Sequence, residues 1–279
     1  MGKKIAIALF IIGCTIPLAT GLGYSLLYSF GIIGILNEGF TLQNWLTVFQ
    51  GEFFNSIIHS VYIALVSTLL SAFLAFFFLG FGKTYWLKKN QYRALFLPLT
   101  IPPIVSAFVI FQLYAGSGLF SRFANQAGLI GSISEFPNLV QDPWAIGIII
   151  THVFLVFPFF LLILLNLYQN EKLDSIESAA KTLGASTTQI FFKLQMPVLL
   201  RRIFPMLALY FIFFLGAYEI PLILGQSSPQ MISVLIVEKL QRFNLSDIPV
   251  AHAMAAWYSL LCLGTITVLF YQYKKRFML

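Results

Sequence analysis

Residues 143–170 read PWAIGIIITHVFLVFPFFLLILLNLYQN, and no acidic or basic residue occurs among them. An uncharged apolar stretch of ~20 residues is long enough to cross the ~30 Å hydrocarbon core of a bilayer as a helix. Lipid cannot satisfy exposed backbone polar groups, so a helix is the conformation open to such a stretch. The stretch therefore predicts a membrane-spanning helix.

The rest of the chain has the same character. Apolar residues make up 59% of the sequence and charged residues 10%, against roughly 25% charged in soluble domains. Further charge-free runs lie between Lys4 and Glu38, Glu52 and Lys83, Arg93 and Arg122, and Asp247 and Lys274, and a run over residues 203–224 is interrupted only by Glu219. We predict an all-α integral membrane protein with one transmembrane domain over residues 1–279. Its six spans are expected at about residues 7–29, 56–81, 94–115, 144–167, 203–224 and 250–272.

The connecting segments differ in their content of Lys and Arg, which predicts the orientation of the chain. One side collects 14 of them: Lys3, Lys4, Lys83, Lys88, Lys89, Arg93, Lys172, Lys181, Lys193, Arg201, Arg202, Lys274, Lys275 and Arg276. The other side holds 3, namely Arg122, Lys239 and Arg242. Both termini are therefore expected in the cytoplasm. This asymmetry accounts for the net charge of +7 without a nucleic-acid partner.

The cytoplasmic loop over residues 168–202 has the pattern of two short helices with a joint between them. Asp174 is expected to cap the first helix, with Glu177 three residues later completing a capping box. Gly184 can adopt the left-handed conformation that ends a helix. Ser186 with Gln189 forms a second capping-box pattern, and Pro197 is expected to limit the second helix.

The first of these helices has an apolar face, made by Ile176, Ala179, Ala180 and Leu183 at helical spacing. The small pair Ala179 and Ala180 would let another surface approach the backbone closely. Two interpretations follow from the residues alone: an element that docks on a partner, and an amphipathic helix that lies on the membrane surface.

The same loop resembles the EAA loop of binding-protein-dependent ABC importer permeases. The residues that match are Glu177-Ser178-Ala179-Ala180-Lys181-Thr182-Leu183-Gly184-Ala185-Ser186, with Pro197 13 residues after Gly184. The loop follows the fourth expected span, as in the six-helix type I members of that family, and residues 40–45 and 97–103 are similar as well. The glutamate of the motif falls on Ser178, with Glu177 adjacent.

The resemblance implies a permease subunit of the bacterial inner membrane that is not itself an enzyme. Its loop would be a coupling helix between spans four and five, held in a groove of a separate cytoplasmic ATPase dimer. ATP and Mg would be bound by that ATPase, with no cofactor on this chain. A second permease, identical or homologous, and an extracytoplasmic substrate-binding protein would complete the importer. The coupling residues would be Glu177, Ser178, Ala179, Ala180, Gly184, Ala185 and Pro197.

Glu219 is the one formal charge inside an expected span. A charge within a membrane helix costs about 2.5–3.5 kcal/mol even on a lenient scale, so it should face the bundle or a wet cavity. Its surroundings, Gly216-Ala217-Tyr218-Glu219-Ile220-Pro221, are typical of a broken helix. Tyr218, Glu219 and Pro221 are therefore candidates for a pathway or gate that favours cationic cargo, while a purely structural carboxylate is the alternative. The setting also resembles permeases for polyamines, ferric iron, thiamine and phosphonates.

Other classes predict features that can be sought in the sequence. His59, His152 and His252 fall near the outer ends of three spans, where interfacial anchors are commoner than a metal site, and we predict no metal. A secondary transporter would show internal repeats or several intramembrane charges, and a membrane-embedded enzyme or assembly protein would need a catalytic constellation. Either rival would work without an ATPase partner.

Overall fold

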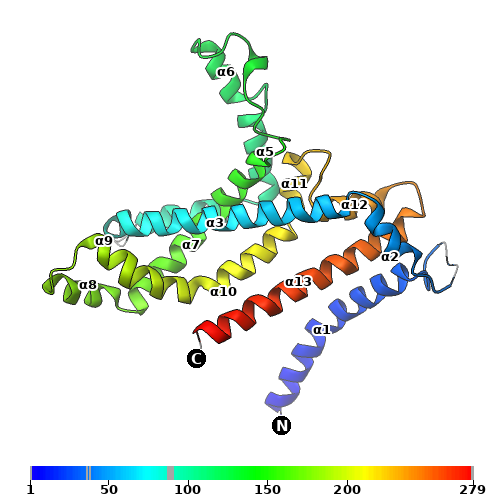
Figure 1. The fold of residues 1–279 in the computed structure, drawn as a ribbon, viewed down its shortest axis with the longest axis horizontal. Helices are drawn as coiled ribbons and strands as arrows, with labels where there is room; N and C mark the ends of the chain where they lie inside the picture. Colours follow the sequence, from blue (N-terminus) through cyan, green and yellow to red (C-terminus); the bar gives the residue numbers. More distant parts are fainter. Residues whose placement is uncertain (1, 36, 38, 87–90, 278–279) are drawn as a thin grey trace. The chain divides into compact units, whose positions relative to one another are not determined.

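The computed structural model describes residues 2–35, 37, 39–86 and 91–277, and Figure 1 shows their fold. Lys88 and Lys89, which entered the charge count, and Glu38 lie outside the described residues. Over that part of the chain the regular structure is helical, without a strand. Six helical segments are long and apolar enough to cross a membrane, which confirms the predicted fold class. They cover Lys4–Ser29, Phe53–Lys83, Pro103–Gln126, Ile146–Asn170, Thr187–Leu215 and Asp247–Lys275. The orientation of the termini stays a prediction.

The chain divides into two compact units. The first unit comprises Met1–Ile57 with Ile232–Thr265, and the second comprises Ile58–Met231 with Ile266–Leu279. The first contains α1 (Gly2–Ser29), α2 (Gln43–Thr47), η1 (Val48–Gln50), the start of α3 (Phe53–Trp86), α12 (Ile232–Gln241) and most of α13 (Asp247–Phe277).

Apolar burial and several polar contacts hold the first unit together. Val48, Phe53, Ile232 and Met254 are at most 2% exposed and form its core, and burying such side chains contributes about 1.5–3 kcal/mol each. On the neighbouring helices, the Ser25 hydroxyl of α1 lies 3.0 Å from Nδ1 of His252 on α13. His252 therefore has a structural partner inside this unit.

The second unit contains the rest of α3 and a longer series of elements. These are η2 (Gln91–Leu95), α4 (Phe96–Leu99), α5 (Pro103–Tyr114), α6 (Leu119–Gln126), η3 (Ile133–Glu135), α7 (Ile146–Asn170), α8 (Leu173–Thr182), α9 (Thr187–Ile190), the π-helical turn η4 (Phe191–Gln195), α10 (Met196–Leu215) and α11 (Glu219–Leu224). The helix α7 is the central element, because it contacts α4, α5, α8, α10 and α11. Its buried Phe160, Leu161 and Leu164 are fully enclosed.

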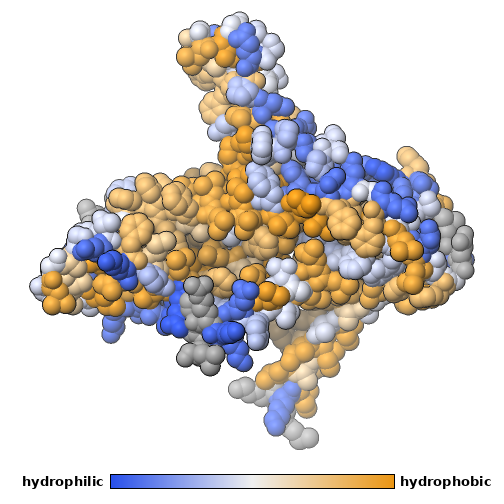
Figure 2. Space-filling model, viewed as in Figure 1, coloured by the Kyte–Doolittle hydropathy of each residue, from blue (hydrophilic) through white to orange (hydrophobic). Residues whose placement is uncertain are grey.

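Apolar side chains also face outward, as lipid requires. On α3 they repeat at every fourth position through Leu65, Leu69, Phe73, Phe77 and Phe81, each at least 47% exposed. Residues four apart share one face of a helix, so α3 presents a continuous apolar stripe. Figure 2 shows apolar side chains over much of the visible surface of the helices. A protein that left this much apolar surface exposed in water would aggregate.

The third span differs from the prediction of one helix over residues 94–115. The structure has η2 and α4, then an interruption at Thr100-Ile101-Pro102, and α5 begins only at Pro103. The residue before a proline is disfavoured in the α conformation, and proline at the first helical position loses no hydrogen bond. The Pro102-Pro103 pair therefore ends one helix and starts the next.

The fifth span also begins earlier than the predicted residue 203. Helix runs from Thr187 through η4 to Leu215, so the expectation that Pro197 limits the second loop helix was wrong. Pro197 is in the first turn of α10, immediately after the π-helical turn. Proline lacks an N–H to donate, and a π-helical turn changes the local bonding so that the chain continues as helix. The predicted break at Gly216–Tyr218 is present between α10 and α11.

A tight turn joins α5 to α6. The N–H of Gly118 donates to the carbonyl of Ala115 at 2.7 Å. A Cβ placed on Gly118 would lie 2.8 Å from the Gln112 carbonyl oxygen and 2.9 Å from those of Leu113 and Ala115. Only glycine fits there without a shift of backbone.

We expect Gly118→Ala to destabilise the second unit by about 1–3 kcal/mol, because the added methyl group overpacks three fixed carbonyls. A loss of 1 kcal/mol lowers the melting temperature of a domain of this size by about 2–4 °C. The measurement is thermal unfolding of the protein in detergent. Gly116→Ala in the same turn is the control, since its Cβ would meet nothing within 4 Å. Equal melting temperatures for the two variants would contradict this account of the turn.

Candidate functional site

The helix α8 begins differently from the predicted capping box. Its N-cap is Lys172, with φ 50°, and no side chain caps the helix. Asp174 lies in the first turn, where its Oδ1 accepts a hydrogen bond from the Tyr168 hydroxyl at 2.9 Å. Glu177 is not its capping partner either, because its side chain turns into the protein. The predicted cap at Asp174 was wrong because a neighbouring helix offers Asp174 a better partner.

The joint after α8 follows the prediction. Gly184 has φ +82°, a left-handed value that glycine adopts at no steric cost. Ser186 then caps α9, since its Oγ accepts the N–H of Gln189 at 3.3 Å. The Gln189 side chain accepts the N–H of Ser186 at 3.0 Å in return. The two helices are thus separated by a defined turn.

The two faces of α8 have different environments. Leu173, Glu177 and Ala180 are buried. On the other side Ile176 is 41% exposed and Leu183 is 88% exposed, and Ser178 and Ala179 are exposed as well. The apolar stripe recognised in the sequence therefore points away from the second unit, except for Ala180. Of the remaining coupling residues, Ala185 is half-buried, and Gly184 and Pro197 are exposed.

The buried carboxylate of Glu177 is the centre of a polar cluster. Its Oε2 pairs with the Lys83 ammonium and accepts hydrogen bonds from Gln195 and from Tyr168, both at 3.0 Å. Its Oε1 pairs with Lys181 at 2.8 Å. Tyr168 has one hydroxyl proton, so it donates to Glu177 or to Asp174 at a given moment. The carboxylate thus has donors on both oxygens, which is the condition for burying a charge.

The cluster sets the ionisation of this carboxyl group. Burial raises the pKa of Glu177, but hydrogen bonds from Lys181, Lys83, Gln195 and Tyr168 outweigh burial and lower the pKa to about 2. Glu177 is therefore charged throughout the physiological range. Sequence reasoning placed Glu177 in the coupling loop but missed this cluster, because Lys83 and Gln195 lie far from it in sequence.

The second candidate feature is a hollow of about 640 Å³ in the second unit. It lies where the two interrupted spans meet α7, and α11 packs against both α5 and α7. Tyr218 and Glu219, two of the three candidate pathway residues, are among its lining residues, and their role in a pathway stays a prediction. Pro221 is buried within α11 and is not among the lining residues. The lining is otherwise largely apolar and includes Leu99, Leu155, Val156, Phe213 and Ile220.

His152 also lines this hollow, which the sequence did not indicate. Its ring stacks on Phe214 with centroids 4.2 Å apart, and its Nδ1 lies 3.3 Å from the Ser67 hydroxyl. His152 lies opposite the two interruptions of the spans, which is a feature of the structure and not of the sequence pattern. His59 lies elsewhere, stacked on Tyr62, and His252 belongs to the first unit. Within residues 2–35, 37, 39–86 and 91–277 no three metal-ligating side chains come together.

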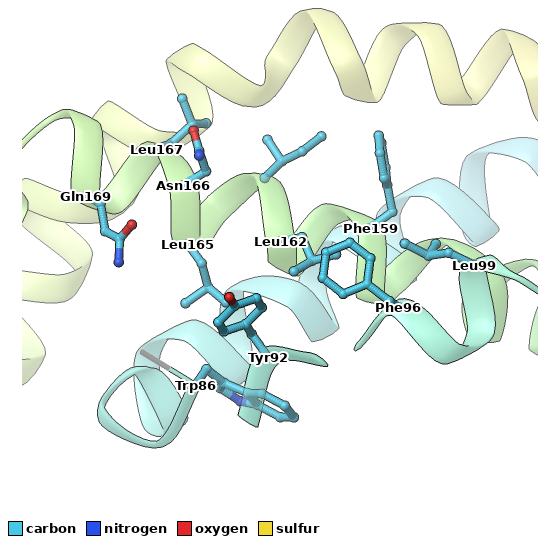
Figure 3. Close-up of a pocket in the computed structure, with 11 residues that line it drawn as sticks. Trp86, Tyr92, Phe96, Leu99, Phe159, Leu162, Leu165, Asn166, Leu167 and Gln169 are labelled. Carbon is cyan, nitrogen blue, oxygen red and sulfur yellow. The ribbon is translucent and has the colours of Figure 1, made fainter. Parts of the chain in front are cut away.

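A further hollow of about 730 Å³ opens beside the other end of α7. Figure 3 shows Tyr92 beside Leu165 and Phe96 beside Leu162 of α7, with Trp86 at the end of α3. Asn166 and Gln169 are its amide-bearing side chains. No acidic or basic side chain is among its lining residues in the described part of the chain.

Comparison with known proteins shows which proteins this chain is similar to. Residues 77–278 match the family described as "Binding-protein-dependent transport system inner membrane component". The spermidine/putrescine transport system permease protein PotB of Escherichia coli is 27% identical over 223 residues, covering 77% of this chain and 76% of PotB. The sulfate transport system permease protein CysT of Salmonella typhimurium is 28% identical over 225 residues, covering 75% and 76%.

The fold has a counterpart among solved structures. A chain of a bacterial alginate ABC transporter, in complex with an alginate pentasaccharide-bound periplasmic protein, superposes with a TM-score of 0.68. The match covers 96% of this chain and 90% of the other at 17% identity. At that identity the likeness concerns the fold alone.

We expect the packing of α8 to be independent of pH down to about 4.5 and to weaken below it. A carboxyl group with a lowered pKa stabilises the folded state above its unfolded pKa of 4.5, and that stabilisation is lost as the pH falls towards about 2. The measurement is hydrogen exchange of α8 amides, corrected for the intrinsic rate, between pH 8 and pH 3. The control is Glu177→Gln, whose protection should be lower and should not change with pH. A fall in wild-type protection between pH 8 and pH 6 would show that another group governs the packing.

Proposed function

The chain belongs to the family of binding-protein-dependent transport system inner membrane components, and we propose that α8 and α9 dock in a partner ATPase while the hollow at Glu219 passes the cargo. It is a multi-pass permease subunit of an ATP-binding-cassette importer. The observation on which the docking proposal rests is the apolar stripe of α8, which faces away from its own unit. A stripe that the fold itself leaves uncovered needs another surface.

The outward stripe is held rigidly, and this favours docking over a helix that merely floats on the membrane. The inner face of α8 is fixed by the buried Glu177 cluster. The far end is fixed by Gly184 and by the Ser186 capping box. A docking element needs such fixation because a rigid segment loses little conformational entropy on binding.

The partners follow from the division of labour in such importers. A cytoplasmic ATPase dimer would bind ATP and Mg, and a second permease, identical or homologous, would complete the pathway. An extracytoplasmic substrate-binding protein would deliver the cargo, in line with the periplasmic protein in the alginate transporter complex. Closure of the ATPase dimer would favour one of two arrangements of the spans. A secondary transporter or an assembly protein would not need the outward stripe of α8.

The cargo we propose is a small cation. The similar proteins differ in the charge of their cargo, since one is named for spermidine and putrescine and another for sulfate. The proposal for the charge of the cargo therefore rests on the residues of the hollow. Glu219 is the acidic residue among the lining residues of the hollow and is exposed there. Tyr210 and Tyr218 add hydroxyl groups to an otherwise apolar wall. A lining of this kind fits a small cation with apolar segments, such as a polyamine.

We expect Leu183→Asp to abolish co-purification of the ATPase in mild detergent, because it puts a charge in the centre of an apolar contact. Leu183 is 88% exposed, so the variant should insert and fold like the wild type. Leu129→Asp is the matched control, since Leu129 is 79% exposed but lies beyond α6. Retention of the ATPase by the Leu183 variant would argue for the membrane-surface interpretation.

We expect Glu219→Gln to reduce uptake of spermidine or putrescine by about tenfold, the equivalent of about 1.4 kcal/mol, while the ATPase still co-purifies. Removing the carboxylate removes the counter-charge in the hollow, and Glu219→Asp should retain part of the uptake. Uptake is measured with radiolabelled solutes in cells that contain the whole importer, with sulfate and thiamine as further solutes. If the Gln variant imports every solute like the wild type, Glu219 has a structural role.

A further inference from the structure

We propose that the buried Lys83–Glu177 cluster is the joint that transmits movement of α8 into the spans, so that Glu177 positions the coupling helix and does not contact the ATPase. The proposal rests on the proposed docking of α8 and assigns separate roles to neighbouring residues. Ser178 and Leu183 face outward, and Glu177 faces inward.

Four elements meet at this one carboxylate. Lys83 stands in the last turn of α3, Tyr168 is near the end of α7, Gln195 ends the π-helical turn before α10, and Glu177 is on α8. Each of the first three donates to, or pairs with, the same Oε2 atom. A displacement of α8 would therefore have to move the ends of three spans with it or break several charge-assisted contacts.

Burial separates the contacts at Oε2 of Glu177 from the docking surface, whereas Lys181, which pairs with Oε1, is 53% exposed. The Glu177 side chain is 10% exposed and that of Lys83 is 20% exposed, and Tyr168 is fully enclosed. An ion pair at an exposed position contributes little, whereas removing one partner of a buried pair leaves an uncompensated charge. Contact with a partner through Glu177 would require this cluster to open first.

An apolar contact beside the cluster joins the same elements. Gly80 is one turn before Lys83 on α3, and a Cβ placed on it would lie 3.0 Å from the Phe191 ring. Phe191 opens the π-helical turn that ends at Gln195. The α3 end therefore approaches the ring of Phe191 directly and is linked to the π-helical turn a second time through the Glu177 carboxylate, which Lys83 and Gln195 share. Two separate contacts prevent the end of α3 from rotating against the π-helical turn, which a single contact would allow.

The loss of the cluster should uncouple hydrolysis from transport. Without it α8 keeps the packing of Leu173 and Ala180 and the Tyr168–Asp174 hydrogen bond, but it loses the contacts of Glu177 with α3 and with the π-helical turn. The helix could still dock in the ATPase, and its movement would be passed less effectively to α3 and to the π-helical turn. ATP hydrolysis would then continue with less solute carried for each ATP.

The experiment compares Glu177→Gln, Lys83→Met and the double variant in the complete importer, reconstituted in liposomes with its ATPase and binding protein. We expect normal co-purification of the ATPase and at least a fivefold fall in solute imported per ATP hydrolysed in all three. Glu171→Gln is the matched control, because it removes a more exposed ion pair, with Arg202 at 2.7 Å, that links the C-cap of α7 to α10. Its ratio of transport to hydrolysis should equal that of the wild type.

Several results would overturn the proposal. Loss of the ATPase from Glu177→Gln would show that Glu177 belongs to the docking surface, and an unchanged ratio in all three variants would show that the cluster transmits nothing. The double variant removes both charges, so it tests the joint even if a single variant with an unpaired buried charge does not accumulate. If none of the three accumulates in the membrane, the cluster serves folding and the proposal is wrong. Absence of an ATPase from the wild-type preparation would instead contradict the proposed function.

Discussion

In a bilayer every backbone N–H and C=O must find its partner within the chain, and this constraint governs where the spans of this protein are continuous and where they are not. The apolar stretches of α3, α7 and α13 satisfy it by remaining helical for 34, 25 and 31 residues. The interruptions at Thr100–Pro102 and at Gly216–Tyr218 expose backbone groups. Both interruptions border the same hollow against α7, so the exposed groups lie where protein or solute, and not lipid, surrounds them.

The effect of a proline on a helix of this chain depends on its position. Pro102-Pro103 breaks a span because it directs the preceding residue out of the helical conformation, whereas Pro158 within α7 and Pro205 within α10 leave their helices intact. Pro197 was expected to end a helix. It is instead part of a continuing helix, because the π-helical turn before it alters the local hydrogen bonding. Composition around a proline therefore does not fix its effect, and the bonding of the preceding turn has to be known.

Much of the fold could be predicted from sequence because the length of an apolar run depends only on consecutive residues. Charge-free runs placed six spans, and Gly184 and Ser186 marked the joint between α8 and α9. The Glu177 cluster could not be predicted in this way, because its partners Lys83 and Gln195 come from segments 94 and 18 residues distant. Asp174 was misassigned because its partner Tyr168, although only six residues away, belongs to another helix. Local patterns indicate where many helices begin and end, as at Gly184 and Ser186, while contacts between helices determine which polar groups are buried.

The two candidate functional features of the second unit are joined by one helix. From Thr187 to Leu215 the chain is helical over 29 residues, which corresponds to about 43 Å at 1.5 Å per residue. One end of this helix begins beside the Ser186 cap and includes Gln195 of the Glu177 cluster, and the other ends at the interruption before Glu219. A helix of this length bends only gently unless its ladder of hydrogen bonds is interrupted, and the π-helical turn is such an interruption near its base. If the loop that precedes η4 is displaced, this helix must therefore either bend at η4 or carry the movement as far as Gly216. The buried carboxylate of Glu177, which is bound to Gln195, opposes bending at η4.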